Sequence, residues 1–258
     1  PAVRPFSRHG WDRLGSSFEN SMAERTSIGG PRPQICLDPD EFQGDPNWHL
    51  DDILREFIEG FHFLLPLKKE VTIFGSNRVS PDHQWYQEAR RLGAMLAERG
   101  YLVITGGGGG VMEAANRGAH ETCLQTHREC SVGLDIVLPY GERKNVYLDK
   151  RMAFHYFFTR KVMLRASAQA YVFFPGGFGT IDEFTETLTL VQTKKMESVP
   201  LVCVGKSYWE PFRAWMHAQM LAGPEPMIGR DDLELFPIVD TAEDALAIVE
   251  TSKERKFF

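Results

Sequence analysis

The stretch YVFFPGGFGTIDE, residues 171–183, organises the rest of the chain. Its four leading apolar residues are typical of a buried strand, and the glycines that follow predict a sharp turn into a helix opened by Thr180, Asp182 and Glu183. Glycines without a Cβ allow a phosphate to approach the main chain, and the free N–H groups at the start of a helix neutralise its charge. The stretch therefore predicts a strand, a loop and a helix that together bind an anion.

Two carboxylates stand in the predicted first turn of this helix. The helix dipole alone explains Asp182, because acidic residues stabilise the start of a helix. Glu183 follows at a position that projects beside the sugar of a ligand whose phosphate lies on the loop. A carboxylate there is able to act as a base or as an electrostatic stabiliser, so Glu183 is a candidate catalytic group.

Length and composition predict one large domain. The chain has 258 residues, 43% of them hydrophobic and 25% charged, which suffices for one α/β domain or for a domain with an arm. The net charge of −6 argues against a general nucleic-acid binder, so we expect no nucleic-acid partner. No run approaches the roughly 18 apolar residues of a membrane span, and the N-terminus lacks an apolar signal core. We expect a cytoplasmic protein without a membrane partner.

The four cysteines form no CxxC pair. Cys123 and Cys130 lack the histidine spacing of a zinc site. Cys203 falls inside an apolar strand pattern, which favours a reduced and buried thiol. We expect neither a metal nor another cofactor.

The chain divides into an N-terminal arm and one domain. Residues 1–49 combine Gly, Pro, Ser and Arg without a sustained hydrophobic period, which predicts an arm or a disordered tail. Residues 50–258 predict a nucleotide-binding domain. It opens with helical spacing of apolar residues from Leu54 to Leu65, a face that must pack on the domain or on a second subunit.

Strands and helices then alternate along the domain. The predicted strands are 71–74, 101–104, 132–138, 171–174, 199–204 and 237–239. The predicted helices are 85–99, 111–121, 152–168, 180–195, 209–221 and a last one capped by Thr241. Strands joined by helices require a parallel sheet with helices on both faces, so the fold class is α/β, a Rossmann-like doubly wound sheet.

Two glycine-rich turns, 105–110 and 175–179, each lead from a strand into a helix. Loops at the carboxyl edge of a parallel sheet surround the crevice where strand order reverses, so we expect both turns to face one ligand. Val111 stands where a GxGxxG fingerprint needs its third glycine, and neither turn is a P-loop, so NAD and ATP are disfavoured. The candidate phosphate-binding groups are Gly106, Gly107, Gly108, Gly109, Gly176, Gly177, Gly179 and Thr180, with Ser76 as a further donor and Phe178 placed to touch a base.

Arg160 and Lys161 lie late in the predicted helix 152–168. Cations near a helix C-terminus often only complement the dipole. The same helix is rich in aromatic and apolar residues, so we expect it to be largely buried and its cations to meet a partner or a ligand. Arg160 precedes Glu183 by 23 residues, so we expect the guanidinium and the carboxylate to flank one ligand.

These motifs resemble the "lonely guy" (LOG) family, whose hallmark is PGGxGTxxE: here GGG at 106–108, Arg160-Lys161 and PGGFGTIDE at 175–183. The resemblance covers about residues 70–220. It implies a Rossmann-like fold and hydrolysis of the N-glycosidic bond of a nucleoside 5′-monophosphate, giving free base and ribose 5-phosphate. It also implies that Arg160 and Glu183 are the catalytic pair and that the nucleotide contacts are Lys161, Gly177, Phe178, Gly179, Thr180, Asp182, Thr189 and Glu142.

The function expected from the resemblance is a phosphoribohydrolase of AMP or an N6-modified AMP that forms at least a homodimer. The name lysine decarboxylase is also attached to this family, but nothing in the chain resembles the pyridoxal site of a decarboxylase. One alternative is a carrier or sensor of a nucleotide-like ligand, which would need the glycine turns but no carboxylate beside the sugar. A second alternative is an RNA-associated role of the arginine-bearing arm.

Overall fold

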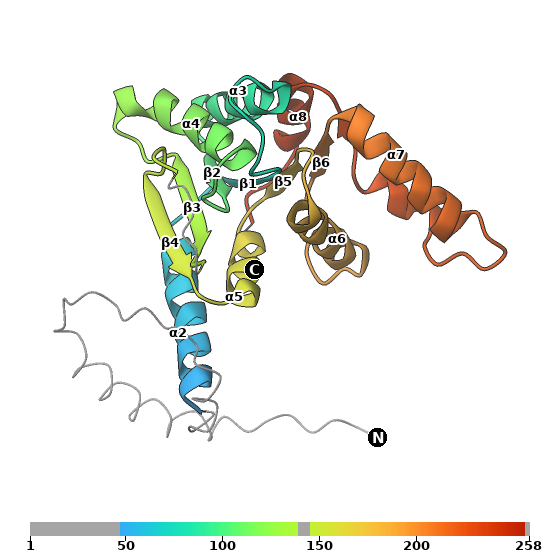
Figure 1. Ribbon diagram of the computed structural model, residues 1–258, viewed down its shortest axis with the longest axis horizontal. Coiled ribbons are helices and arrows are strands. Elements are labelled where there is room, and N and C mark those ends of the chain that lie inside the picture. Colours follow the sequence, from blue (N-terminus) through green and yellow to red (C-terminus); the bar gives the residue numbers. More distant parts are fainter. Residues whose placement is uncertain (1–46, 139–144, 256–258) are drawn as a thin grey trace. The chain divides into compact units, whose positions relative to one another are not determined.

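The computed structural model describes residues 47–138 and 145–255. The predicted arm, up to residue 46, and the loop that holds Glu142 lie outside the described residues. The described part forms one seven-stranded sheet of order β4-β3-β2-β1-β5-β6-β7, with helices on both faces (Figure 1). The predicted doubly wound α/β fold is confirmed.

All neighbouring strands of the sheet are parallel. Strands β1 to β4 follow one another outward on one side, whereas β5 returns to the other side of β1 and β6 and β7 continue outward from it. Strand order therefore reverses between β1 and β5. The strands are β1 (Glu70–Phe74), β2 (Leu102–Thr105), β3 (Ser131–Ile136), β4 (Lys150–Phe154), β5 (Ala170–Phe173), β6 (Leu201–Val204) and β7 (Ile238–Val239).

Helices connect most of these strands. The α-helices are α2 (Asn47–Leu64), α3 (Gln84–Glu98), α4 (Val111–Cys123), α5 (Phe157–Ala166), α6 (Phe178–Gln192), α7 (Lys206–Met216) and α8 (Ala242–Val249). Shorter segments are the 3-10 helices η3 (Leu124–Thr126) and η5 (Arg230–Glu234) and the π-helical η4 (His217–Leu221). Among residues 47–138 and 145–255, no helix combines the length and the apolar character needed to cross a membrane.

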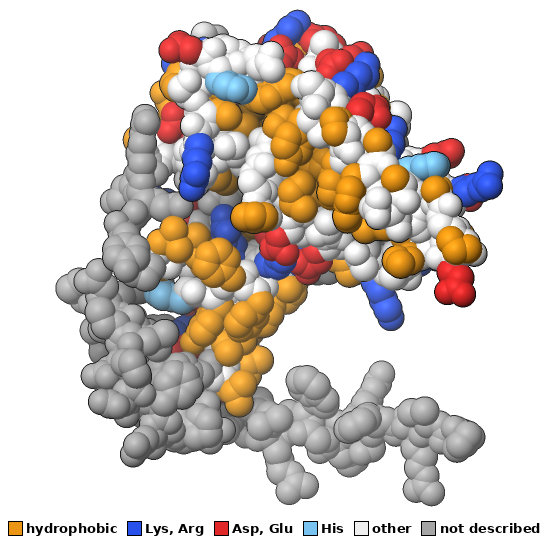
Figure 2. All heavy atoms as spheres, turned by 45° about the vertical axis from the view of Figure 1, so that its right-hand side comes forward, with side chains coloured by type: hydrophobic (Ala, Val, Ile, Leu, Met, Phe, Trp, Pro, Cys, Tyr) orange, Lys and Arg blue, Asp and Glu red, His pale blue; other side chains and the backbone are white. Residues whose placement is uncertain are grey.

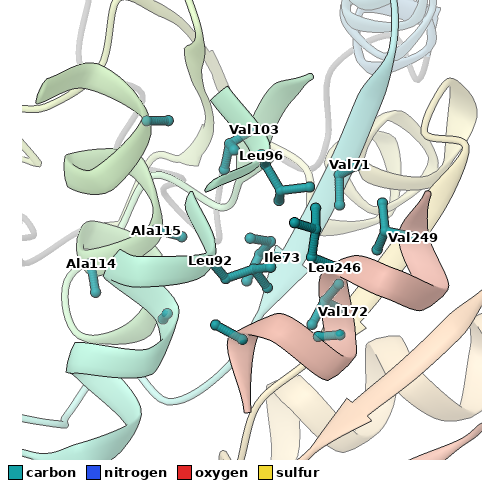
Figure 3. Packing of buried hydrophobic residues seen from close by; sticks show 14 of the residues in the cluster. Val71, Ile73, Leu92, Leu96, Val103, Ala114, Ala115, Val172, Leu246 and Val249 are labelled. Atoms are coloured by element: carbon teal, nitrogen blue, oxygen red, sulfur yellow. The ribbon is translucent and has the colours of Figure 1, made fainter. Parts of the chain in front are cut away.

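The sheet separates two hydrophobic cores. On one face, Val71 and Ile73 of β1 pack with Leu92 and Leu96 of α3 and Leu246 of α8 (Figure 3). On the other face the rings of Phe74, Phe173, Phe184 and Trp209 form a chain of contacts with centroid separations of 5.1, 5.3 and 4.8 Å. Because Phe184 belongs to α6, this aromatic core fixes the helix that carries Glu183.

Helices α3 and α4 cross closely because each has a glycine at the crossing. A Cβ on Gly118 would overlap the carbonyl of Arg90, and a Cβ on Gly93 would overlap the carbonyl of Ala115. We expect Gly118→Ala to lower the free energy of unfolding by about 1–3 kcal/mol, the usual range for overpacking. Urea denaturation measures the change. The control is Gly223→Ala, since a Cβ there meets nothing within 4 Å. Equal midpoints for the two variants would contradict the close crossing.

The predicted helix 152–168 is partly wrong. Its first residues form β4, which pairs with β3 through Leu134–Met152 and Ile136–Phe154, and the helix begins only at Phe157. Burial alternates along this strand, since Arg151 and Ala153 are exposed and Lys150, Met152 and Phe154 are not. The sequence KRMAF itself does not alternate polar and apolar residues, so its periodicity gave no strand signal.

Other helix boundaries differ by a few residues. The helix predicted from 180 begins at Phe178 with Gly177 as its N-cap, and the helix predicted from 209 begins at Lys206 and becomes π-helical from His217. The predicted cap at Thr241 is confirmed, because its hydroxyl accepts from the N–H of Asp244 at 3.1 Å.

Among the described residues, two cysteines form a disulfide that the spacing did not reveal. Cys123 at the end of α4 is bonded to Cys130, with Cα atoms 6.2 Å apart across η3. Cys203 is free and buried, as predicted, and burial raises the pKa of its thiol well above the usual value.

Candidate functional site

Ser76 joins the two glycine-rich turns at the point where strand order reverses. Its N–H donates to the carbonyl of Pro175 at 3.0 Å, and its carbonyl accepts from the N–H of Val111 at 2.9 Å. A Cβ on Gly110, which has φ +62°, would overlap the carbonyl of Ser76. The turns therefore meet at the carboxyl edge between β1 and β5, where doubly wound proteins bind ligands.

The first turn is arranged around Gly107. This residue has φ +73°, a conformation that side-chain-bearing residues rarely adopt. Its N–H donates to the hydroxyl of Thr105 at 3.0 Å, and that hydroxyl donates to Asn116 Oδ1 at 2.5 Å. The N–H of Gly107 is thus used within the protein, so the predicted phosphate contact at this residue does not come from a free donor.

The second turn leaves open space at the N-terminus of α6. A Cβ on Gly177 or Gly179 would meet nothing within 4 Å, and the side chain of Phe178 between them is 97% exposed. The N–H of Thr180 is bonded to the carbonyl of Gly177 at 3.0 Å. The N–H groups before Thr180 point from the positive end of a 15-residue helix, a ready anion site.

Arg160 lies over the ends of two strands. Its Nε donates to the carbonyl of Leu134 on β3 at 2.6 Å, and its Nη2 donates to the carbonyl of Gly106 at 3.0 Å. The guanidinium therefore connects β3 to the first glycine turn. The direct partner of Glu183 is a different arginine of the same helix, described below.

Glu183 is nearly buried, with 12% of its side chain exposed, and its Oε2 accepts from Arg165 Nη1 at 3.0 Å. Burial raises the pKa of Glu183 to about 7, although Arg165, Lys161 and Arg160 lower it. Because α6 begins at Phe178, Glu183 is on its second turn, beyond the free N–H groups.

Lys161 connects α5 to α6 beside the same carboxylate. Its Nζ lies 2.6 Å from Asp182 Oδ2 and 2.7 Å from Glu186 Oε2. Although burial opposes its charge, these two carboxylates raise the pKa of Lys161 above the usual value. Asp182 is therefore an ion-pair partner rather than a first-turn charge.

The burial predicted for α5 holds mainly for its C-terminal half. Met163, Leu164 and Arg165 are buried, but Phe157 and Phe158 are 63% and 48% exposed. The N-terminus of this helix is capped by Glu56 of α2, which accepts from the N–H of His155 and from the hydroxyl of Thr159, both at 2.5 Å. His155 itself is 43% exposed, so it is a neighbour of the cap and not a core residue.

Arg165 is the residue that sequence reasoning missed. Its side chain is 5% exposed, and it contacts both Glu183 and Glu186. The signal was present, because Lys161 and Arg165 are four residues apart on one face of α5 and the two glutamates are three apart on α6. That these faces of α5 and α6 pack against each other depends on the tertiary fold, so the sequence alone did not show it.

The structure does not bring two of the residues expected to contact the nucleotide together with the other candidate site residues. Thr189 is exposed, and its hydroxyl donates to the carbonyl of Thr185 one turn back on α6. Glu142 lies outside the described residues.

The sequence of this chain is similar to those of known proteins. A family model described as "Possible lysine decarboxylase" matches residues 112–249, more than half of the chain. A protein of Archaeoglobus fulgidus named "Uncharacterized protein" is 33% identical over 146 residues, covering 55% of this chain and 87% of the relative.

Two mycobacterial relatives carry a functional name, "Cytokinin riboside 5'-monophosphate phosphoribohydrolase". The protein of Mycobacterium marinum is 26% identical over 170 residues and that of Mycobacterium tuberculosis 26% identical over 171, each alignment covering 65% of this chain and 87% of the relative.

Solved structures show the same fold. The X-ray structure titled TM1055 is 26% identical, with a TM-score of 0.52 over 71% of this chain and 99% of its own. The molybdenum cofactor carrier protein of Chlamydomonas reinhardtii is 19% identical, with a TM-score of 0.50 over 71% of this chain and 97% of its own.

Proposed function

Because the chain belongs to the LOG family, the family matched as "Possible lysine decarboxylase", we propose that it is a phosphoribohydrolase. The substrate is a purine nucleoside 5′-monophosphate, AMP or an N6-modified AMP, and the products are free base and ribose 5-phosphate. The observation that carries the proposal is the near-buried carboxylate of Glu183 beside an open helix N-terminus. The names of the mycobacterial relatives support it.

The phosphate of the substrate binds at the open end of α6, on the N–H groups of Gly177, Phe178 and Gly179. The hydroxyl of Ser76 accepts from the N–H of Arg78 at 3.1 Å and keeps its proton to donate to the phosphate. A helix N-terminus and a hydroxyl donor together favour a dianion.

Cleavage of the bond between ribose and base develops oxocarbenium character at C1′. A carboxylate close to C1′ stabilises that positive charge and orients the attacking water, as carboxylates do in other glycosidases. Glu183 has this role. Arg160, together with Lys161, binds ribose or phosphate oxygens, and the mechanism uses no metal and no cofactor.

The experiment incubates the purified protein with AMP, GMP, CMP, UMP and N6-isopentenyl AMP and follows free base and ribose 5-phosphate by chromatography. We expect base release from at least one purine nucleotide. Intact nucleotides after long incubation, with tight binding still measured by calorimetry, would instead favour a carrier or sensor of a nucleotide-like ligand.

The pH dependence of the reaction identifies the active form of Glu183. Burial raises its pKa to about 7, and the proposed role needs the ionised carboxylate. Ionised Glu183 becomes scarcer as pH falls, so kcat/KM is expected to drop about tenfold per unit below pH 7 and to level off above it. Steady-state rates from pH 5 to 9 measure the profile. A rate that instead falls above pH 7 would assign Glu183 the role of proton donor.

We also propose that the enzyme is a homodimer or a larger homo-oligomer. The exposed apolar side chains of α2 and α5, Leu50, Leu54, Phe157, Phe158 and Val162, form an apolar surface, and Figure 2 shows hydrophobic side chains gathered on this side of the molecule. A second copy would cover it. Sedimentation analysis should give a dimer or larger that Phe158→Glu dissociates; a monomeric wild type at micromolar concentration would contradict the proposal.

The cytoplasm is the proposed location, because nucleoside monophosphates are made and salvaged there. The disulfide between Cys123 and Cys130 is unusual for that compartment. Fractionation of cells that express the protein, with detection by antibody, should recover it with cytoplasmic enzymes. Recovery in an extracytoplasmic fraction would fit the disulfide and reject this location.

A further inference from the structure

We infer that Arg165 is the positioning residue of Glu183: it holds one carboxylate oxygen and leaves the other free for the reaction. The inference rests on the function proposed above for Glu183. Arg165 contacts neither turn, so it acts through Glu183 and not on the substrate.

The contacts of Arg165 distinguish the two oxygens of Glu183. Nη1 donates to Oε2 at 3.0 Å, whereas none of the hydrogen bonds between described residues ends at Oε1, and 12% of the side chain is exposed. Nη2 donates to Glu186, one turn further along α6. A guanidinium is planar, so the direction of the bond from Nη1 to Glu183 follows the orientation of the whole group, which the burial of Arg165 restricts without Glu186. The carboxylate of Glu183 is thereby presented with Oε1 toward the ligand.

The main chain of Arg165 is itself held in place. Its carbonyl accepts from the hydroxyl of Tyr171 at 2.5 Å and from Arg255 Nη1 at 3.3 Å. Tyr171 is fully buried in β5, the strand that leads into the second glycine turn. The side chain of Arg165 therefore starts from an anchored point, which limits how far Glu183 can shift.

Burial gives Arg165 a second effect. The charged groups that face Glu183 are Arg165, Lys161 and Arg160 from α5 and Glu186 from its own helix. Arg165 is the cation in direct contact, and Lys161 and Arg160 are engaged with other groups. A nearly buried carboxylate without its paired cation favours its neutral form. Removing Arg165 should therefore release Glu183. It should also raise the pKa of Glu183, so that the fall of kcat/KM at low pH, the acid limb of the pH profile, begins at a higher pH.

Two variants of Arg165 separate orientation from charge. Arg165→Met removes both, so we expect kcat to fall and the acid limb to move up by about one to three pH units. Arg165→Lys keeps the charge but loses the planar guanidinium that bonds both carboxylates. We therefore expect the acid limb to stay near its wild-type pH and kcat to be about tenfold lower. An Arg165→Lys variant with wild-type kcat would overturn the positioning role, even if Arg165→Met does not fold.

The matched control is Glu186→Gln, which breaks the other ion pair of Arg165. If Arg165 only joined α5 to α6, this control and Arg165→Met would have the same effect. We expect the control to retain kcat and to shift the limb downward or not at all, because Glu186 raises the pKa of Glu183.

A measurement that needs no turnover separates this inference from the proposed function. Carbon-13 NMR of glutamate-labelled protein, with Glu183→Gln to assign the signal, gives the titration midpoint of Glu183 directly. We expect the midpoint to rise in Arg165→Met and not in Glu186→Gln. Absence of hydrolysis in the wild type would reject the proposed function alone, whereas equal midpoints in wild type and Arg165→Met would reject the role of Arg165.

Discussion

Glu183→Gln is expected to lower the rate of base release by about a hundredfold or more, the loss seen when a group that stabilises transition-state charge is removed. Glutamine keeps the size and polarity of the side chain but has no negative charge to stabilise the ribosyl cation. The phosphate site proposed at the N-terminus of α6 does not involve this side chain, so nucleotide binding should be nearly unchanged. Single-turnover kinetics gives the rate, and calorimetry gives the affinity.

The control for this variant lies one turn away on the same helix. Glu186 is 35% exposed and pairs with Lys161 and Arg165, so Glu186→Gln also removes one negative charge from α6. We expect it to retain turnover. Loss of activity in both variants would mean that the charge of the helix matters and not the position of Glu183, and unchanged turnover in Glu183→Gln would remove its catalytic role.

The fold was predictable because its signals are local. Each central strand is a short run of apolar residues, and each glycine turn follows such a run directly, so the alternation of strands and helices could be read along the chain. The β4 strand was missed because KRMAF leads into more aromatic residues without a turn signal. Its identity depends on pairing with β3, which is a long-range property.

The candidate site was only partly predictable for the same reason. The motif positions identify Glu183 and Arg160, but they do not say which group each side chain contacts. That Gly107 donates to Thr105, and that Arg165 rather than Arg160 bonds Glu183, follow from the packing of β2, α5 and α6. The disulfide is similar, since only the turn of η3 brings Cys123 to Cys130.

Arg160→Ala is expected to lower kcat/KM by about a hundredfold to a thousandfold, which is the range for loss of a preorganised donor. The variant loses the cation proposed to bind ribose or phosphate and also frees the carbonyls of Leu134 and Gly106. Unlike Glu183→Gln, it should therefore raise KM as well as lower kcat. Steady-state kinetics with the best nucleotide of the panel separates the two parameters.

Two further variants show whether this loss is specific. Arg160→Lys keeps the charge, but a single ammonium cannot reproduce the fixed fork over both carbonyls, so it should restore only part of the activity. Arg91→Ala removes an exposed arginine of α3 that pairs with Glu243 and should change neither parameter. Because Arg160 and Glu183 are proposed to act on one substrate, the double variant should lose less than the product of the single losses. Fully multiplicative losses would mean that the two residues act independently, and the proposed catalytic pair would then be wrong.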